Sequence, residues 1–210
     1  MPRSAPARPR RRPANKYHHG DLRRALLEEA VRTIQHDGIE ALTLRAVGAR
    51  LRVSRTALYR HFADRSALLG AVSAHGFAML RTALVTAWEG HGRGRAGFDA
   101  MGLAYVDFAL SHPAHYRVMF GGFLAPDVDE EGRSPEARGA FQALVDGILA
   151  QQQAWEMRRD DPLQLALYIW SVVHGVAMLA IDGYLQHHEA DARAIAAFAI
   201  ARMSSGLAPA

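Results

Sequence analysis

The stretch VSRTALYRHF, residues 53–62, decides the fold because it predicts a short helix with two unlike faces. On a wheel of about 100° per residue, one side is apolar and is formed by Ala57, Leu58 and Phe62. The opposite side is basic and aromatic and carries Arg55, Thr56, Tyr59 and Arg60. Arginine reads guanine edges, and Thr and Tyr hydroxyls contact bases and phosphates. The polar side therefore predicts contact with DNA, and a solvated helix face is the alternative.

The residues on either side of this stretch predict a helix-turn-helix. Thr43 is a suitable N-cap for a helix over 44–50, and Ser54 caps the next helix over 55–62. About four residues separate the two helices, which is the dimension of a helix-turn-helix. An amphipathic helix from Asp21 to a stop at Gly38 precedes them. Asp64 begins a long helix that reaches about residue 88.

Charge divides the chain into a basic first third and an acidic remainder. Residues 1–65 hold 15 Lys and Arg against 6 Asp and Glu, a net charge of +9, whereas residues 66–210 carry −5. This asymmetry favours a polyanion-binding end and a different task for the remainder. The segment 1–15 is rich in Arg, Pro and Ala and is predicted to be a disordered basic arm. Its arginines either add phosphate or minor-groove contacts or belong to a solvated tail.

Residues 17–69, YHHGDLRRALLEEAVRTIQHDGIEALTLRAVGARLRVSRTALYRHFADRSALL, resemble the N-terminal domain of TetR-family (tetracycline-repressor-type) transcriptional regulators. The resemblance implies backbone contacts to DNA from Thr43 and Arg45, and base-facing positions at Arg55 and Thr56. The predicted DNA-binding residues are Lys16, Tyr17, Thr43, Arg45, Arg52, Ser54, Arg55, Thr56, Tyr59, Arg60, His61 and Arg65.

Within this set, the resemblance places Tyr59 and His61 on the phosphate side. The wheel itself puts His61 inside the apolar arc, which favours a packed or capping histidine. Arg65 stands where the family usually has a phosphate-binding lysine.

Two positions depart from the family pattern. Arg52 stands in the turn, where the family usually has glycine. If that position needs a positive φ, a non-glycine residue costs about 1 kcal/mol, part of which a phosphate contact would recover. Gly48 stands where a small alanine is usual, which keeps the helices close but weakens the helix slightly.

The remainder of the chain predicts further helices at about 99–111, 137–154, 162–186 and 190–204. Between them, residues 90–99 are expected to form a loop, and Pro113 is expected to break any helix over HPAHYRVMF. No stretch alternates with period two. We therefore expect an all-α fold with a basic arm (1–15), a helix-turn-helix head (16–65) and a helical ligand-binding and dimerisation domain (66–210).

Aromatic and methionine residues of the second domain predict a small-molecule pocket. YIWSVVHGVAMLAIDGY (168–184), with HYRVMFGG (115–122) upstream, resembles the W-H-G type of C-terminal domain found in some family members. His174 is the best polar candidate because it lies one turn from both Trp170 and Met178. The predicted lining residues, each of which is plain core in the alternative reading, are Phe77, Leu80, Leu103, Phe108, Tyr116, Met119, Phe120, Phe123, Trp155, Trp170, His174 and Met178.

Residues 162–181 carry no formal charge, so a membrane span is weighed against a buried helix. Polar residues within the segment and acidic residues at both ends favour the buried helix. We expect homodimerisation over about 162–204, where this helix and the last one form a four-helix bundle with a second copy. The last helix contributes Ile195, Phe198 and Met203.

Enzymatic, nucleotide and metal chemistry find little support in the sequence. Gly92, Gly94 and Gly97 satisfy G-x-G-x-x-G, but that motif needs a preceding strand where a helix is predicted. The pairs His18-His19 and His187-His188 are adjacent and share no helix face, so we expect no metal. No hydrolase, P-loop or metalloprotease motif occurs. The chain has no cysteine and no secretory signal, which fits a cytoplasmic protein. We expect no cofactor.

These features predict a homodimeric regulator that binds a pseudo-palindromic operator with two recognition helices roughly 34–36 Å apart. It is expected to repress transcription and to leave its operator when a small hydrophobic ligand binds the second domain. The alternatives are a ligand-independent or activating regulator, an enzyme, and a non-specific architectural DNA-binding protein. The acidic, aromatic-rich remainder disfavours the last of these.

Overall fold

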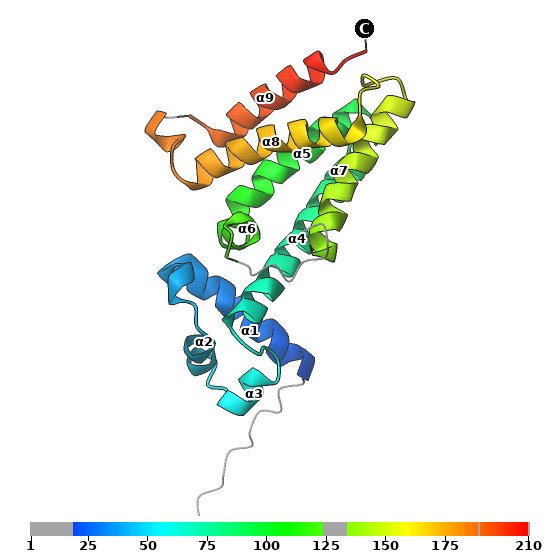
Figure 1. Ribbon diagram of the computed structural model, residues 1–210. Helices are drawn as coiled ribbons and strands as arrows, with labels where there is room; N and C mark the ends of the chain where they lie inside the picture. The colour runs from blue at the N-terminus through cyan, green and yellow to red at the C-terminus, as the bar shows by residue number, and fades with distance from the viewer. Residues whose placement is uncertain (1–18, 124–133, 189, 210) are drawn as a thin grey trace, which may run out of the picture.

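The computed structural model describes residues 19–123, 134–188 and 190–209, and within these ranges its regular elements are all helical (Figure 1). The predicted all-α fold is therefore confirmed. The arm 1–15, Lys16 and Tyr17 lie outside the described residues. The elements are α1 (His19–Asp37), η1 (Ile39–Ala41), α2 (Leu44–Arg50), α3 (Arg55–Tyr59), α4 (Arg65–Gly90), α5 (Arg95–Ser111), α6 (Pro113–Phe120), α7 (Pro135–Gln153), α8 (Pro162–Ile181), η2 (Gln186–His188) and α9 (Ala192–Gly206).

Local signals form the first three helices much as expected. Gly38 takes φ +83° and ends α1, a conformation that is easily accessible to glycine. Helix α2 has the predicted bounds, whereas α3 ends at Tyr59, three residues before the predicted end. Residues 60–61 form a turn, and Phe62 still reaches the core with 4% of its surface exposed.

The core of the head extends beyond the three-helix unit. Besides residues of α1, α2 and α3, it contains Leu68, Leu69 and Val72 from the first two turns of α4. Ala114 and Val118 of α6 belong to the same core. The core of the head is therefore completed by α4 and α6, two helices that it shares with the rest of the molecule.

A second core lies between α4, α5, α7, α8 and α9, at the end of the molecule opposite α3 (Figure 1). Helix α5 packs against α4, α8 and α9, and α7 packs against α4 and α8. Helices α4 and α8 are long and apolar enough to cross a membrane by length and composition. Both contribute buried residues to this core, as the central helices of soluble proteins do.

Three further expectations about element boundaries are wrong. Helix α5 begins at Arg95, inside the expected loop 90–99. Pro113 begins α6 instead of breaking it, because a proline at the first helical position lacks only an N–H that would have no partner there. Helix α8 ends at Ile181 instead of about residue 186, and Gly183 follows with φ +83°.

Candidate nucleic-acid interface and ligand cavity

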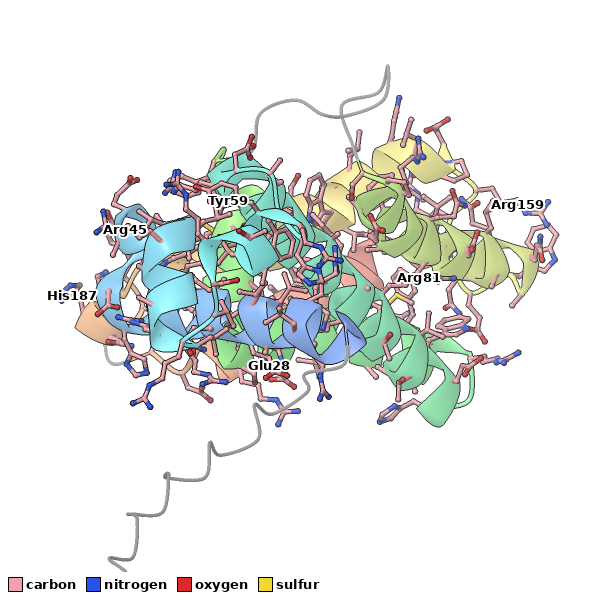
Figure 2. The ribbon with its side chains drawn as sticks, turned by 90° about the horizontal axis from the view of Figure 1, so that it is seen from below. Glu28, Arg45, Tyr59, Arg81, Arg159 and His187 are labelled. Carbon is pink, nitrogen blue, oxygen red and sulfur yellow. The ribbon has the colours of Figure 1, made fainter. Side chains whose placement is uncertain are left out.

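Helix α3 is anchored on one side and exposed on the other. Leu58 and Phe62 are buried in the head core, and the hydroxyl of Ser54 accepts a hydrogen bond from the Ala57 N–H at 3.2 Å. The opposite side is exposed, and it consists of Arg55, Thr56, Tyr59 and Arg60. The Arg55 guanidinium lies 5.5 Å from the centre of the Tyr59 ring, with which it forms a cation–π contact. Figure 2 shows Arg45 and Tyr59 from this end of the molecule.

Helix α2 is fixed on α1 by Arg50. Its Nη1 donates to the Thr33 hydroxyl at 2.9 Å, and its Nη2 donates to the Asp37 carboxylate at 2.6 Å. A carboxylate oxygen of Glu29 lies 3.5 Å from Nη1. The hydrogen bond to Asp37 is the main reason why the pKa of Arg50 is raised. The guanidinium of Arg50 therefore joins α2 to α1 within the head.

Two exposed residues at the start of α2 keep their predicted surface positions. The Thr43 hydroxyl caps α2 by accepting a hydrogen bond from the Ala46 N–H at 3.0 Å. Thr43 and Arg45 are both exposed, as contacts to a DNA backbone require.

The turn between α2 and α3 has the geometry that a glycine normally provides. Arg52 is exposed and adopts φ +54°, so this position does require the positive φ that glycine adopts without strain. Gly48 lets α2 and α3 approach closely, because a Cβ added there would lie 2.8 Å from Leu58 Cδ1. The position of α3 thus depends on Arg52, which holds a positive φ, and on Gly48, which has no side chain to separate the two helices.

Arg65 acts within the head. Its Nε donates to the Leu42 carbonyl at 2.9 Å, and its Nη2 donates to the Ile39 carbonyl at 2.8 Å. A Glu40 carboxylate oxygen lies 3.7 Å from the same Nη2. Arg65 thus joins the start of α4 to η1, and its phosphate contact stays a prediction. His61 is half-buried.

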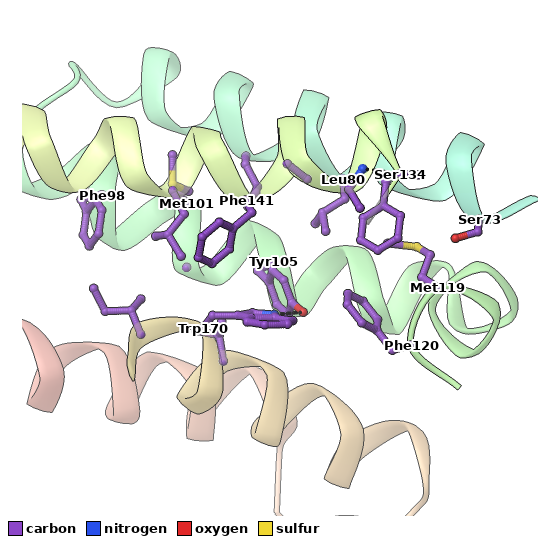
Figure 3. A pocket seen from close by; sticks show the side chains of 18 of the residues that line it. Ser73, Leu80, Phe98, Met101, Tyr105, Met119, Phe120, Ser134, Phe141 and Trp170 are labelled. Atoms are coloured by element: carbon purple, nitrogen blue, oxygen red, sulfur yellow. Dashed lines mark hydrogen bonds between the residues drawn. The ribbon is translucent and has the colours of Figure 1, made fainter. Parts of the chain in front are cut away.

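A cavity of about 950 Å³ lies in the second core and reaches the start of α4 (Figure 3). Its wall includes five of the predicted lining residues, and these are Phe77, Leu80, Met119, Phe120 and Trp170. Sequence reasoning missed other residues of the wall, among them Phe98, Asp99, Met101, Tyr105, Phe141 and Met203. The volume suits a drug-sized molecule.

The structure does not bring the other seven predicted residues to the cavity wall. Phe108 is buried in the core beside it, and Leu103 and Met178 are half-buried against that core. Phe123 is exposed, and Trp155 has 67% of its surface exposed beneath the Arg159 guanidinium. The remaining two are Tyr116 and His174, which lie behind the wall.

A chain of polar groups runs from the wall to α6. The Trp170 Nε1–H donates to the Tyr105 hydroxyl at 3.0 Å, and the hydroxyls of Tyr105 and Tyr116 are 2.9 Å apart. His174 Nδ1 lies 2.7 Å from the Tyr116 hydroxyl and 3.0 Å from that of Tyr105. Tyr105 can thus donate to Tyr116, which donates to an unprotonated Nδ1.

Burial favours the neutral form of each titratable member of this chain. It raises the pKa of Tyr105 to about 12, and it raises that of Tyr116 as well. It lowers the pKa of His174, which is consistent with an imidazole nitrogen that accepts a hydrogen bond.

Helix α6 connects the two cores. Ala114 and Val118 pack in the head, whereas Met119 lines the cavity. The buried His115 packs against α4, where its Nε2 lies 3.3 Å from His75 Nδ1. Burial, followed by the nearby charges of His75 and His112, lowers the pKa of His115 to about 4.

Helices α8 and α9 expose large apolar side chains to solvent. Those of α8 are Leu163, Leu167, Tyr168 and Leu179, and those of α9 are Ile195 and Phe198. Met203 is also expected in this interface from the sequence, but it is buried and lines the cavity.

Comparison with known proteins places both parts of the chain in one group. Residues 26–72 match the family of bacterial regulatory proteins, tetR family. Residues 98–203 match the tetracyclin repressor-like, C-terminal domain. Over 173 residues the chain is 25% identical to an uncharacterized HTH-type transcriptional regulator from Mycobacterium tuberculosis, covering 81% of this chain and 75% of that protein.

Solved structures share the fold over nearly the whole length. A protein of unknown function from Rhodococcus sp. RHA1 is 34% identical, with a TM-score of 0.82, and the match covers 93% of this chain and 100% of that one. The protein in a SmeT–triclosan complex is 16% identical, with a TM-score of 0.67, over 89% of this chain and 91% of that one. The latter likeness shows the fold alone.

Proposed function

The chain belongs to the TetR family of bacterial regulatory proteins, and we propose that it is a transcriptional repressor that a small apolar ligand releases from its operator. The observation that carries this proposal is the double role of α4. Leu68 and Leu69 pack in the head core, while Phe77 and Leu80 of the same helix line the cavity. A ligand that moves α4 therefore moves the head, provided that it binds the two arrangements unequally.

The proposed DNA contacts come from the exposed side of α3 and the start of α2. Arg55 and Thr56 are the proposed base readers, and Tyr59, Arg60 and Arg45 contact the backbone. We add Thr43, Arg52, Ser54, His61 and Arg65 as proposed backbone-side residues, and Lys16 and Tyr17 from the preceding segment. We further propose that the segment 16–65 is the DNA-binding unit and 66–210 the ligand-binding and dimerisation unit.

The proposed assembly is a homodimer through the exposed apolar faces of α8 and α9. Regulators of this family act as dimers, and these faces are what a four-helix interface between two copies requires. Two heads would then contact successive major grooves of a pseudo-palindromic operator, roughly 34–36 Å apart. The proposed place of action is the cytoplasm, where such DNA is found.

Base reading is tested with Arg55→Ala and Thr56→Ala on an operator selected from random duplexes. Each variant should bind the operator about 1–3 kcal/mol more weakly and should discriminate less between bases. Arg158→Ala is the control, because Arg158 pairs with Asp160 on the second domain at 3.3 Å, before α8 begins. Unchanged operator selectivity in both α3 variants would remove the assignment of α3 as the recognition helix.

Ligand release is tested with N-phenyl-1-naphthylamine, a neutral apolar dye that brightens when it enters a dry cavity. The solved SmeT–triclosan complex, a protein of the same fold, motivates the search for an apolar effector. Saturating dye should lower the affinity for labelled operator, measured by fluorescence anisotropy. An unchanged affinity with a filled cavity would favour a ligand-independent regulator.

A further inference from the structure

We propose that the ligand of the cavity is a lipophilic cation, an elongated apolar molecule with an ammonium-type group that pairs with Asp99. This inference rests on the proposed ligand-released function and specifies its ligand. It follows from three properties of the cavity wall, which are its charge, its aromatic rings and its length.

The formal charge of the wall is negative. Among the described residues that line the cavity, the carboxylates are Asp64 and Asp99, and Lys, Arg and His do not occur there. Asp64 is occupied as the N-cap of α4, because it accepts a hydrogen bond from the Ala67 N–H at 2.8 Å. An anionic ligand would therefore enter without a compensating cation and would meet like charge.

Asp99 can still accept a partner. Its Oδ1 accepts a hydrogen bond from the Ser204 hydroxyl at 2.5 Å, and its Oδ2 has no hydrogen-bond partner among the described residues. Arg95 and Glu156, one basic and one acidic, border a small void next to the cavity together with Asp99, and no ion pair joins either of them to Asp99 among the described residues. A ligand cation would place an opposite charge beside this half-buried carboxylate, which has none paired with it among the described residues.

Aromatic rings surround the middle of the cavity (Figure 3). Trp170 lies 6.0 Å from Phe141 and 6.1 Å from Phe120, and Phe120 lies 5.4 Å from Phe77, measured between ring centres. The Trp170 N–H is already used by Tyr105, so this side chain offers a ligand mainly its ring face. Ring faces pack well against alkyl chains, so these rings suit the apolar part of a ligand whose cation pairs with Asp99.

The wall also favours a long molecule. It follows α4 from Ser66 to Leu84, which spans about 27 Å at a rise of 1.5 Å per residue. A ten-carbon chain that carries a trimethylammonium group is shorter than this span and so fits within it lengthwise, and it presents a cation without a hydrogen-bond donor. Decyltrimethylammonium is therefore the probe, and decanoate and 1-decanol are its anionic and neutral counterparts.

The experiment measures the binding of the three probes to the full-length protein by calorimetry, below the micelle concentrations of the two ionic probes and below the solubility limit of 1-decanol. Decyltrimethylammonium should bind about tenfold more tightly than 1-decanol, and decanoate should bind more weakly than the alcohol. Asp99→Asn keeps the shape of the side chain and removes its charge. This variant should lose most of the preference for the cation while its affinity for 1-decanol stays the same.

Asp107→Asn is the matched control on the same helix. Asp107 lies away from the cavity wall and pairs with Arg193, so its loss of charge should leave the affinities of all three probes unchanged. Tighter binding of decanoate, or an unaltered cation preference in Asp99→Asn, would overturn the inference and leave the ligand site standing. Failure of all three probes to bind would remove both the proposed apolar ligand site and this inference.

Discussion

At Arg52, this head has a non-glycine residue with a positive φ, which departs from the usual family pattern. The residue holds φ +54° in the turn before α3, where glycine is usual, and a left-handed conformation costs an ordinary residue about 1 kcal/mol. Arg52→Gly should raise the free energy of unfolding by up to about 1 kcal/mol, because the relieved strain exceeds the greater freedom of glycine in the unfolded chain. Urea denaturation measures this change.

The same variant separates the backbone of Arg52 from its charge. If the side chain contacts a phosphate, Arg52→Gly weakens binding similarly for all DNA sequences and lowers the salt slope by about 1. Arg93→Gly is the control, since Arg93 holds φ +56° in the turn after α4 and pairs with Glu89. It should change stability without changing the salt slope. An unaltered slope in Arg52→Gly would show that Arg52 serves only the turn.

Gly48 governs the contact between the two helices of the head. Gly48→Ala places a Cβ about 2.8 Å from Leu58 Cδ1, and such overpacking costs about 1–3 kcal/mol, against a helix-propensity gain of about 1 kcal/mol. We expect the variant to be about 1 kcal/mol less stable. In a Leu58→Val background, which lacks Cδ1, Gly48→Ala should instead be neutral or stabilising. Equal effects in the two backgrounds would show that Leu58 is not the limiting neighbour.

His115 makes the packing of α6 on α4 sensitive to pH. Its pKa is about 4 in the folded protein and about 6.5 in an unfolded chain, so the unfolded chain takes up the proton first. The free energy of unfolding should therefore fall as the pH decreases from 6.5 to 4. At about 1.4 kcal/mol per pKa unit, reduced for partial solvation, the loss is on the order of 2 kcal/mol.

Denaturation at several pH values tests this linkage. His115→Phe keeps an aromatic ring in place but cannot titrate, so its stability should depend less on pH between 6.5 and 4 than that of the wild type. His188→Gln, which changes an exposed histidine of η2, should keep the wild-type dependence. A His115→Phe profile that parallels the wild type would show that other groups cause the dependence.

Local sequence signals predicted the elements of the head better than those of the second domain. Thr43 caps α2 where expected, because a cap depends on a hydroxyl and an N–H three residues apart. Pro113 was misread, because proline ends a helix from within but begins one at its first position. Helix α6 packs on α1 and α4, which lie far from it in the sequence, so local spacing alone did not show which of the two occurs.

The cavity could be predicted in composition but only partly in detail. Phe77 and Trp170 line it as expected, whereas Tyr116 and His174 lie one layer behind, bound to the hydroxyl of Tyr105. Which residues of a hydrophobic helix face a cavity depends on how that helix is rotated against its neighbours. That rotation arises from contacts between residues far apart in sequence, such as Tyr105 and His174, which no local spacing reveals.

At the level of the whole molecule, α8 and α9 expose an apolar face to solvent that no other part of the same chain covers among the described residues. Single exposed hydrophobic residues are common, but here several large ones occur on two packed helices. Phe198, with 60% of its surface exposed, is a suitable residue to test. Phe198→Asn should shift the protein from dimer to monomer in sedimentation experiments at micromolar concentration.

Loss of the dimer should then lower the affinity for a full operator but not the affinity for a half-site. Two linked heads gain from effective concentration, so a monomer should bind a full operator about 100-fold more weakly and a single half-site with unchanged affinity. Trp155→Asn is the matched control, because Trp155 is similarly exposed but lies in the turn after α7. It should remain a dimer. If Phe198→Asn also remains a dimer at the same concentration, then the proposed interface must be moved elsewhere on the surface.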